Sequence, residues 1–316
     1  MLSIVIPCFN KQGQIATTLN SVLKQSFHDY EIIIVDDGST DNSIEIIQQF
    51  NDSRIKLIQQ TNSGVSAARN NGIKNASGDW IAFLDADDWW HPEYLKNIHT
   101  IITAHPEAKV VSTGFFCKPD TPNWQPNAWP LSSQLPEIEV IKNLPERWLQ
   151  SIPFFTSSVC IHKNFLQTMH PWFPDNESNG EDLDLWLRIA EHENIFHLPT
   201  ELVVYRTEQQ QSLTSNYAPL EDPPFIKRMQ SRAQNRDFPP QLKNATLLFV
   251  AQNKLIRARQ AILQQRRGKA FKLVFSSIYA FKIKRWWMTL FMALFLPTPL
   301  VQKWQNKRSG TKELIQ

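Results

Sequence analysis

The first hundred residues alternate short apolar runs with amphipathic stretches. Nearly continuous apolar runs predict buried strands of a parallel sheet, and amphipathic stretches predict helices with one apolar face. The expected strands are residues 2–6, 30–35, 55–60 and 80–84, and the expected helices are residues 14–25, 44–50 and 65–76. This alternation predicts an α/β fold with a mostly parallel central sheet flanked by helices.

The pattern changes after residue 115. Seven prolines and three tryptophans interrupt residues 116–153, which predicts an irregular segment over one face of the sheet. Regular structure is expected again at "GEDLDLWLRIAEHE", a helix, and at "IFHLPTELVVYR", two short strands. The sequence therefore predicts one domain over residues 1–215, a proline-rich linker over 216–240 and a helical tail over 241–316.

Charge divides the chain in the same place. Residues 1–237 hold 18 Lys and Arg against 29 Asp and Glu, whereas residues 238–316 hold 15 against one. Such asymmetry indicates two functional regions. The acidic excess of the first region argues against nucleic acid as its ligand, so no nucleic-acid partner is expected.

The basic tail also carries an apolar face. One helical face is expected to hold Phe271, Val274, Phe275, Ile278 and Phe281, beside several lysines. The uncharged run 286–301 is shorter than the roughly 20 residues that cross a bilayer, and two prolines interrupt it. We therefore expect a helix lying in an anionic membrane surface, with its tryptophans at the headgroups. The alternative is a buried C-terminal helix of the globular domain.

Cysteine and the first residues bear on the compartment. The three cysteines have no metal-like spacing and imply no disulfide framework, which favours a reducing compartment. The opening "LSIVIPCFN" predicts a core strand rather than a secretion signal. We expect a cytoplasmic protein.

Three acidic groups mark candidate chemistry. The first two follow expected strands, and in parallel sheets ligands bind at the carboxyl ends of strands. A turn would explain the first group, and favourable charge at a helix start would explain one or two members of the third. The second group, with two carboxylates one residue apart at a strand end, favours a site for a hard divalent cation, and a solvated acidic loop is its alternative. The groups are Asp36 and Asp37; Asp85, Asp87 and Asp88; and Glu181, Asp182 and Asp184.

The blocks together resemble a known family. "SIVIPCFNKQGQIATTLNSVLKQSFHDYEIIIVDDGSTDNS", "GVSAARNNGIKNASGDWIAFLDADD" and "GEDLDLWLR" are similar, in order and spacing, to the inverting family 2 glycosyltransferases with the GT-A fold. The resemblance covers about residues 2–206. It implies a nucleotide-sugar half over about 1–115 and an acceptor half over about 116–215.

The resemblance also implies roles for the residues that bind the nucleotide. Pro7, Phe9 and Asn10, together with Asp37 and the adjacent Asp36, would hold the base and ribose. The expected donor is a nucleoside-diphosphate sugar, with UDP-sugars favoured.

The remaining roles concern the diphosphate and the metal. Arg69 would approach the diphosphate or the base, and Asp85 would face the sugar and ribose. Asp87 would bind Mn²⁺ or Mg²⁺, with Asp85 and Asp88 nearby. The cation would offset the repulsion between these carboxylates and stabilise the charge that develops on the leaving diphosphate.

On the acceptor side, the resemblance implies Asp182 as the general base, with Glu181 beside it in the catalytic pair. Trp186 would help to shape the acceptor site. Two features depart from the family pattern: Leu183 stands where a tryptophan is common, and "YRTEQQQSLTS" has Glu208 or a glutamine where a histidine is expected.

Three classes of function compete for this sequence. The leading hypothesis is an enzyme that glycosylates a lipid-linked or saccharide acceptor on the inner face of the cell membrane, in bacterial surface-polysaccharide or glycolipid synthesis. A non-catalytic nucleotide-sugar-binding subunit is the alternative, although such a protein would be expected to have lost Asp87 or Asp182. A nucleotidyltransferase would favour a glycine- and lysine-rich loop where the sequence has "PCFNKQG".

Overall fold

The chain forms two compact units. The computed structural model describes residues 1–119, 129–132, 136–175, 177, 180–207 and 221–304. The first unit, here called the sheet unit, comprises residues 1–142 and 151–212, and the second, the helical unit, comprises residues 143–150 and 213–316. The helical unit thus takes one short helix from the middle of the chain.

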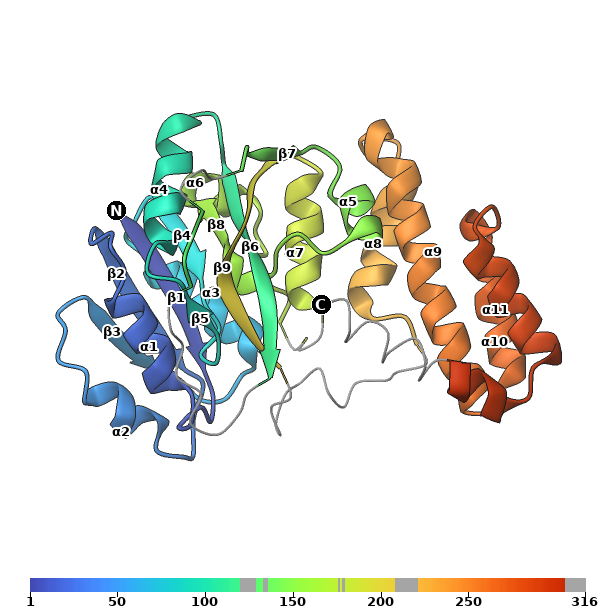
Figure 1. The fold of residues 1–316 in the computed structure, drawn as a ribbon, viewed down its shortest axis with the longest axis horizontal. Helices are drawn as coiled ribbons and strands as arrows, with labels where there is room; N and C mark the ends of the chain where they lie inside the picture. The colour runs from blue at the N-terminus through green and yellow to red at the C-terminus, as the bar shows by residue number, and fades with distance from the viewer. Residues whose placement is uncertain (120–128, 133–135, 176, 178–179, 208–220, 305–316) are drawn as a thin grey trace. The chain divides into compact units, whose positions relative to one another are not determined.

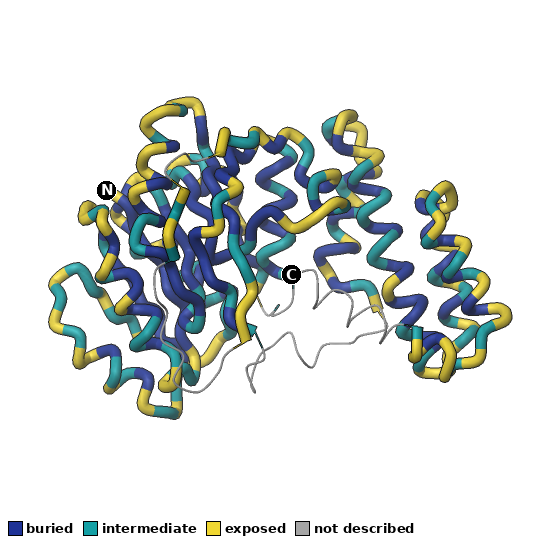
Figure 2. Tube along the Cα trace, in the orientation of Figure 1, coloured by how far each residue is buried: buried dark blue, intermediate teal, exposed yellow. Residues whose placement is uncertain are grey.

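A nine-stranded sheet runs through the sheet unit in the order β3-β2-β1-β4-β8-β6-β9-β5, with β7 paired to β9 (Figure 1). The central strand β1 is buried at all seven positions, so both of its faces are covered (Figure 2). The strands are β1 (Leu2–Cys8), β2 (Tyr30–Asp36), β3 (Ile55–Gln59), β4 (Trp80–Phe83), β5 (Trp89–Trp90), β6 (Val110–Pro119), β7 (Glu139–Ile141), β8 (Val159–His162) and β9 (Ile195–Thr207).

Helices connect these strands along the chain. Those of the sheet unit are α1 (Ile15–Leu23), α2 (Ser43–Gln48), α3 (Val65–Asn75), α4 (Tyr94–Ala104), α6 (Lys163–Thr168), α7 (Glu181–Ala190) and the 3₁₀ turn η1 (Thr156–Ser158). The α/β class predicted from the sequence, with helices flanking a central sheet, is confirmed.

Strand direction differs between the two sides of the sheet. β3, β2, β1 and β4 are parallel, as their continuous apolar runs predict. Antiparallel pairs enter through β8, which lies between β4 and β6, and through β5 and β7 on β9. The parallel side therefore brings the carboxyl ends of β1, β2 and β4 to one edge.

The stretch expected to form two strands is one strand, β9. Its pairing with β6 shifts register, because Thr113 lies opposite Leu198 and Gly114 lies opposite Glu201. Pro199 and Thr200 fall in this irregularity, and a proline there has no N–H to donate to the ladder. The interruption of the apolar pattern was real, but it marks a bulge rather than a strand end.

The helical unit is built around α9. Its elements are α5 (Leu144–Gln150), α8 (Pro224–Gln234), α9 (Pro240–Leu263), α10 (Arg267–Ser276), η2 (Ile278–Ala280) and α11 (Lys284–Phe295). Residues 216–240, where the sequence predicts a linker, thus contain α8. Two apolar clusters join α9, α10 and α11, and one of them is centred on Leu255, Val274 and Trp286.

The apolar residues of the tail divide between a core and a surface. Trp286 is 4% exposed and donates its indole N–H to the Val274 carbonyl at 2.9 Å, whereas Trp287 is 57% exposed. Only one of the two tryptophans is therefore at the surface. Within the described residues, no helix has the length and apolarity needed to cross a membrane.

The packing of α3 on β1 depends on Gly72. A Cβ added at this residue would lie 2.3 Å from Cγ1 of Val5, which is fully buried in β1. Because a buried β-branched side chain has little freedom to move, Gly72→Ala should lower the free energy of unfolding by about 2 kcal/mol.

Urea denaturation measures this effect, and Gly268→Ala in α10 is the matched control. Nothing lies within 4 Å of an added Cβ at Gly268, so this variant should be neutral or slightly more stable. An unchanged unfolding midpoint in Gly72→Ala would contradict the close approach of α3 to β1.

Candidate functional site

Backbone bonds align the ends of three adjacent parallel strands. The Asp37 N–H donates to the Cys8 carbonyl at 2.8 Å, and the Leu84 N–H donates to the Val5 carbonyl at 3.0 Å. The residues that follow β1, β2 and β4 therefore meet at one edge. The sequence predicted this convergence from the position of the aspartates after apolar runs.

Asp37 fixes the loop that leads into α3. Its Oδ1 accepts from Gln60 Nε2 at 2.7 Å and from the Ser63 N–H at 2.9 Å, and its Oδ2 accepts from the Gly64 N–H at 2.8 Å. The residue is 3% exposed. Both carboxylate oxygens are thus engaged within the protein.

The neighbouring Asp36 is less completely satisfied. Its Oδ2 accepts from the Ser39 N–H at 3.1 Å, while the buried Oδ1 has no hydrogen-bond partner among the described residues. A buried carboxylate oxygen without a partner is costly, so this atom is a candidate acceptor for a ligand.

Asn10 and Phe9 differ in their exposure to solvent. Asn10 has φ of 51°, its N–H donates to Ser39 Oγ at 2.9 Å, and its Oδ1 accepts from the Thr40 N–H at 2.8 Å. Asparagine tolerates this left-handed conformation better than most residues. The loop after β1 is thus braced against the loop after β2, while Phe9 stays 44% exposed.

Arg69 of α3 connects two of the acidic groups. Its Nη2 donates to Asp85 Oδ1 and its Nη1 donates to Glu181 Oε1, both at 2.7 Å. Its guanidinium carbon also lies 5.3 Å from the Phe173 ring centroid. Arg69 is 4% exposed and bonds a carboxylate through each terminal nitrogen, so it holds Asp85 and Glu181 in place from the interior of the protein.

Burial shifts the protonation of the two carboxylates that share the Arg69 guanidinium. Burial and the neighbouring Asp182 together raise the pKa of Glu181 to about 7, against the opposing effect of Arg69. Burial likewise raises the pKa of Asp85, opposed by Arg69 and assisted by Asp87. Burial lowers the pKa of Arg69, but the surrounding carboxylates raise it more. The cluster is a buried, net-negative group around a permanent cation.

The three aspartates that follow β4 have three different environments. Asp85 is held by Arg69, as described above. Asp88 is 1% exposed, and its oxygens accept from Ser157 Oγ at 2.5 Å and from the Arg206 N–H at 3.2 Å. Asp87 is 19% exposed and forms an ion pair with Lys11 Nζ at 2.5 Å. Of the three, Asp87 is the carboxylate paired with a lysine ammonium.

This arrangement decides how a divalent cation could fit. In the described part of the chain, no three His, Cys, Asp or Glu side chains are grouped to hold a metal. Magnesium-type ions are commonly held by one or two carboxylates, with substrate phosphates and water as the other ligands. Asp87 can supply such a carboxylate, so the residues fit a cation that needs the substrate to complete its coordination.

The start of α7 supplies the third group of acidic residues. Asp182 is partly buried, and its Oδ2 accepts from Thr156 Oγ1 at 2.8 Å. Asp184 is buried and paired with Arg188 at 3.1 Å. Helix-start charge thus accounts for Asp184, whereas Asp182 lies close enough to raise the pKa of both Asp85 and Glu181.

Trp186 lies inside the protein rather than on a surface. It is 1% exposed, and its ring centroid is 5.9 Å from that of Phe83 and 6.0 Å from that of Phe173. Any influence on an acceptor site therefore acts through the packing of α7. Glu208, where the family pattern changes, lies outside the described residues.

Sequence reasoning missed four contacts of the site. Lys11, Thr156, Ser157 and Arg206 each bond an acidic group, and Arg206 also donates from Nε to the Asp87 carbonyl. Tyr205 and Arg206 were noted as part of a family motif, but Lys11 and the two η1 residues carried no signal that separated them from ordinary polar residues.

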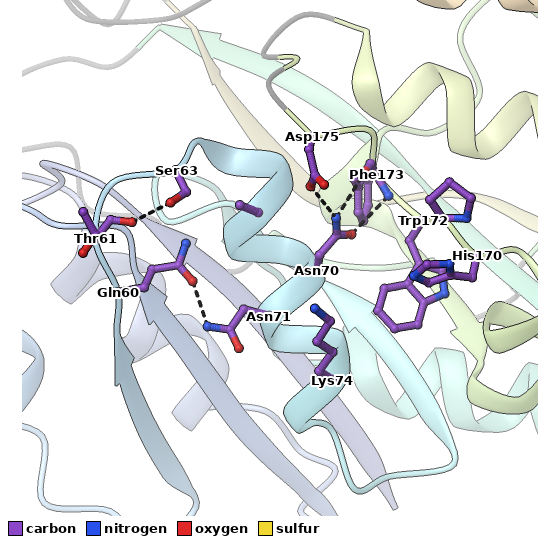
Figure 3. A pocket seen from close by; sticks show the side chains of 12 residues that line it. Gln60, Thr61, Ser63, Asn70, Asn71, Lys74, His170, Trp172, Phe173 and Asp175 are labelled. Atoms are coloured by element: carbon purple, nitrogen blue, oxygen red, sulfur yellow. Dashed lines mark hydrogen bonds between the residues drawn. The ribbon is translucent and has the colours of Figure 1, made fainter.

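A cavity of about 420 Å³ lies on the other side of α3 (Figure 3). Asn70 spans part of its wall, donating to the Phe173 carbonyl at 2.8 Å and accepting from the Phe173 N–H at 3.1 Å. Gln60 and Ser63 line the cavity and also bond Asp37. None of the predicted site residues lines it, so the cavity adjoins the carboxylate site without being part of it.

Comparison with known sequences identifies relatives. Residues 3–167 match the family described as glycosyl transferase family 2. The chain is 38% identical to glycosyltransferase GlyA of Streptococcus pneumoniae over 106 residues, which are 33% of this chain and 15% of GlyA. It is 43% identical over 97 residues to WfgD of Escherichia coli, a UDP-Glc:α-D-GlcNAc-diphosphoundecaprenol β-1,3-glucosyltransferase, covering 30% of this chain and 38% of WfgD. The chain thus spans well under half of these curated relatives.

Solved structures share the fold. A Staphylococcus aureus TarS fragment in complex with UDP-GlcNAc superposes with a TM-score of 0.66 at 22% identity, covering 87% of this chain and 81% of that one. The mannosyltransferase PcManGT of Pyrobaculum calidifontis, in complex with GDP-Man and Mn²⁺, gives 0.57 at 17% identity, covering 98% and 84%. The GT-A type of sheet expected from the sequence is confirmed by these superpositions.

The raised pKa of Glu181 predicts a pH dependence of stability. A carboxyl whose pKa is higher in the folded than in the unfolded protein stabilises the folded state when it is protonated. The free energy of unfolding should therefore rise as the pH falls from 8 towards 5, and fall as the pH rises through about 7. Glu181 alone should account for about 2 kcal/mol over this range.

Unfolding free energies at pH 5 and pH 8, compared between the wild type and Glu181→Gln, isolate this contribution. The glutamine keeps an oxygen acceptor for Arg69 but cannot titrate, so the variant should depend less on pH. Equal pH dependence in the two proteins would show that Glu181 does not titrate in this range.

Proposed function

The chain belongs to glycosyl transferase family 2, and from this premise we propose that it transfers a sugar from a nucleoside-diphosphate sugar to an acceptor hydroxyl with inversion. The observation that carries the proposal is the arrangement at one sheet edge. Asp37 follows β2, Asp87 follows β4 and is paired with the Lys11 ammonium, and Asp182 lies at the start of α7, close enough to raise the pKa of Asp85.

The donor would lie along the ends of β1 and β2. The exposed ring of Phe9 offers a face for a nucleobase, and the unpartnered Oδ1 of Asp36 can accept a hydrogen bond from the base or ribose. Pro7, Asn10 and Asp37 would act by holding the loops in place. We favour a UDP-sugar, since WfgD uses UDP-Glc by its name and the TarS fragment was crystallised with UDP-GlcNAc.

Asp87 would hold Mn²⁺ or Mg²⁺, which would offset the negative charge of the leaving diphosphate. A Mn²⁺ ion accompanies the donor in the PcManGT complex, which supports this choice. Arg69 keeps Asp85 and Glu181 in position, and Asp88 anchors the loop through Ser157 and Arg206. Asp85 would then face the sugar and ribose side.

Asp182 would be the general base. The bond between the acceptor oxygen and the anomeric carbon would form as the bond from that carbon to the diphosphate breaks, and Asp182 would take the hydroxyl proton. Thr156 donates to Oδ2 and so orients the carboxylate. A single displacement of this kind inverts the anomeric configuration.

The acceptor is proposed to be a saccharide linked to a membrane lipid, since WfgD acts on a diphosphoundecaprenol-linked sugar by its name. The helical unit supports a membrane position on the cytoplasmic face. It exposes nine large apolar side chains between residues 275 and 300, among exposed lysines. No acidic residue occurs between residues 238 and 304, which favours an anionic surface.

Asp182→Asn should retain metal-dependent binding of the UDP-sugar donor and lose at least 100-fold in transfer, because the asparagine cannot accept a proton. Asp87→Asn should instead lose metal-dependent donor binding. Calorimetric donor binding and transfer to a lipid-linked acceptor, measured on both variants, separate the two roles.

Weakened donor binding in Asp182→Asn would contradict its role as base. A wild-type protein that binds the donor but transfers to no lipid-linked or soluble saccharide would favour the non-catalytic subunit instead.

Membrane attachment is tested on the exposed face of α11. Trp287, Phe291 and Phe295 recur at every fourth residue and are 57%, 53% and 67% exposed. Replacing all three by serine should weaken binding to vesicles containing phosphatidylglycerol by at least tenfold, since each large apolar side chain contributes about 1.5–3 kcal/mol on burial.

Ile256→Ser, a change at an exposed apolar residue of α9, is the matched control and should bind as the wild type does. Vesicle co-sedimentation provides the measurement. Undiminished binding of the triple variant would place membrane contact elsewhere or remove it.

A further inference from the structure

The ion pair between Lys11 and Asp87 brings together two loops far apart in the chain. Lys11 follows β1 and Asp87 follows β4, and their side chains are 22% and 19% exposed. The Lys11 N–H donates to Ser43 Oγ at 2.8 Å, and the preceding Asn10 is bonded to Ser39 and Thr40. The backbone at Lys11 is therefore held in place, and the ammonium is carried on a four-carbon side chain with several rotatable bonds.

The pair occupies the position that the proposed function gives to the metal. Asp85 is bonded to Arg69 and Asp88 to Ser157 and Arg206, whereas Asp87 is the carboxylate of the group that pairs with Lys11. An ammonium 2.5 Å from Oδ2 takes up the space and the lone pairs that a divalent ion bound to this oxygen would use. The two cations therefore compete for one carboxylate.

We propose that Lys11 acts as a resident counter-ion of Asp87 that the divalent cation must displace, and that the displaced ammonium then binds the diphosphate of the donor. This inference rests on the proposed function. It makes Lys11 a positioning residue that links two binding events.

A thermodynamic consequence follows from this exchange. Without nucleotide, the cation must break the Lys11–Asp87 pair and leave the ammonium without that partner. With a diphosphate present, the ammonium gains a new anion, so the cation and the nucleotide should bind cooperatively. The coupling must be reciprocal, since each ligand changes the affinity of the other by the same factor.

The experiment measures Mn²⁺ binding to the full chain by electron paramagnetic resonance of the free ion, with and without UDP. The proteins are the wild type, Lys11→Met, Lys24→Met and Asp87→Asn. Lys24→Met is the matched control, because it removes an exposed lysine at the end of α1 that has no ion pair with Asp87.

Lys11→Met should bind Mn²⁺ about tenfold more tightly than the wild type in the absence of UDP, and UDP should enhance its Mn²⁺ affinity less. Lys24→Met should match the wild type. A residue with a merely structural role would weaken binding when removed, so the direction of the change is decisive. Unchanged or weaker Mn²⁺ binding in Lys11→Met, with Asp87→Asn clearly impaired, would overturn the displacement while leaving the metal at Asp87.

Failure of the proposed function has a different signature. Equal Mn²⁺ binding by Asp87→Asn and the wild type in the presence of UDP would remove the metal from Asp87 and overturn both proposals.

A second measurement follows Lys11 directly, in protein whose lysines carry ¹³C-methyl groups. The NMR signal of Lys11 is identified by its absence from Lys11→Met. Mg²⁺ with UDP should shift this signal, and Asp87→Asn should shift it in the same way. A signal that stays unchanged on saturation with both would overturn the displacement.

Discussion

The site depends on the two hydrogen bonds that Arg69 donates to Asp85 and Glu181, here called the Arg69 fork. It joins α3, the end of β4 and the start of α7, segments separated by as many as 112 residues in sequence. A buried guanidinium is tolerated only when it is paired and hydrogen-bonded, and here Nη1 and Nη2 each bond a carboxylate, while the buried Nε has no partner among the described residues. The site and the interior of the sheet unit therefore stabilise each other.

The acidic residues near the Arg69 fork differ in their bonding partners. Arg69 takes two carboxylates, Ser157 and the Arg206 backbone take Asp88, and Asp37 is used by the loop before α3. Asp87 and Asp182 have Lys11 and Thr156 as partners instead. A cluster that looks uniformly acidic in sequence is thus a set of carboxylates with different partners, and we propose that Asp87 and Asp182 are the two that take part in the chemistry.

Local pattern predicted the first hundred residues well because burial is nearly continuous along β1, β2 and β4. The runs around Ile4, Ile33 and Ala82 are buried on both faces, and a sequence reports such burial directly. The sequence did not predict the bulge in β9, because a break in an apolar run looks the same whether a strand ends or its pairing shifts register. In the tail, Trp286 is buried and the neighbouring Trp287 is exposed, a difference that a band of aromatic residues does not reveal.

Partners distant in sequence could not be predicted at all. Family resemblance marked Arg69 and Glu181 as site residues, but nothing in their spacing tells that they bond each other. Lys11 is separated from Asp87 by 76 residues and stands among ordinary loop residues. Charge pairing across such distances is decided by how the loops after β1 and β4 meet, which depends on the sheet register.

The central claim is that Arg69 retains Asp85 when the donor is bound, so that Asp87 alone of the three aspartates binds the metal. Anomalous scattering from Mn²⁺ in crystals grown with a non-hydrolysable UDP-sugar tests it most directly. The account predicts a single Mn²⁺ on Asp87 and the diphosphate, with the Arg69 fork to Asp85 and Glu181 intact. A Mn²⁺ bridging Asp85 and Asp87, with Arg69 withdrawn from Asp85, would contradict it.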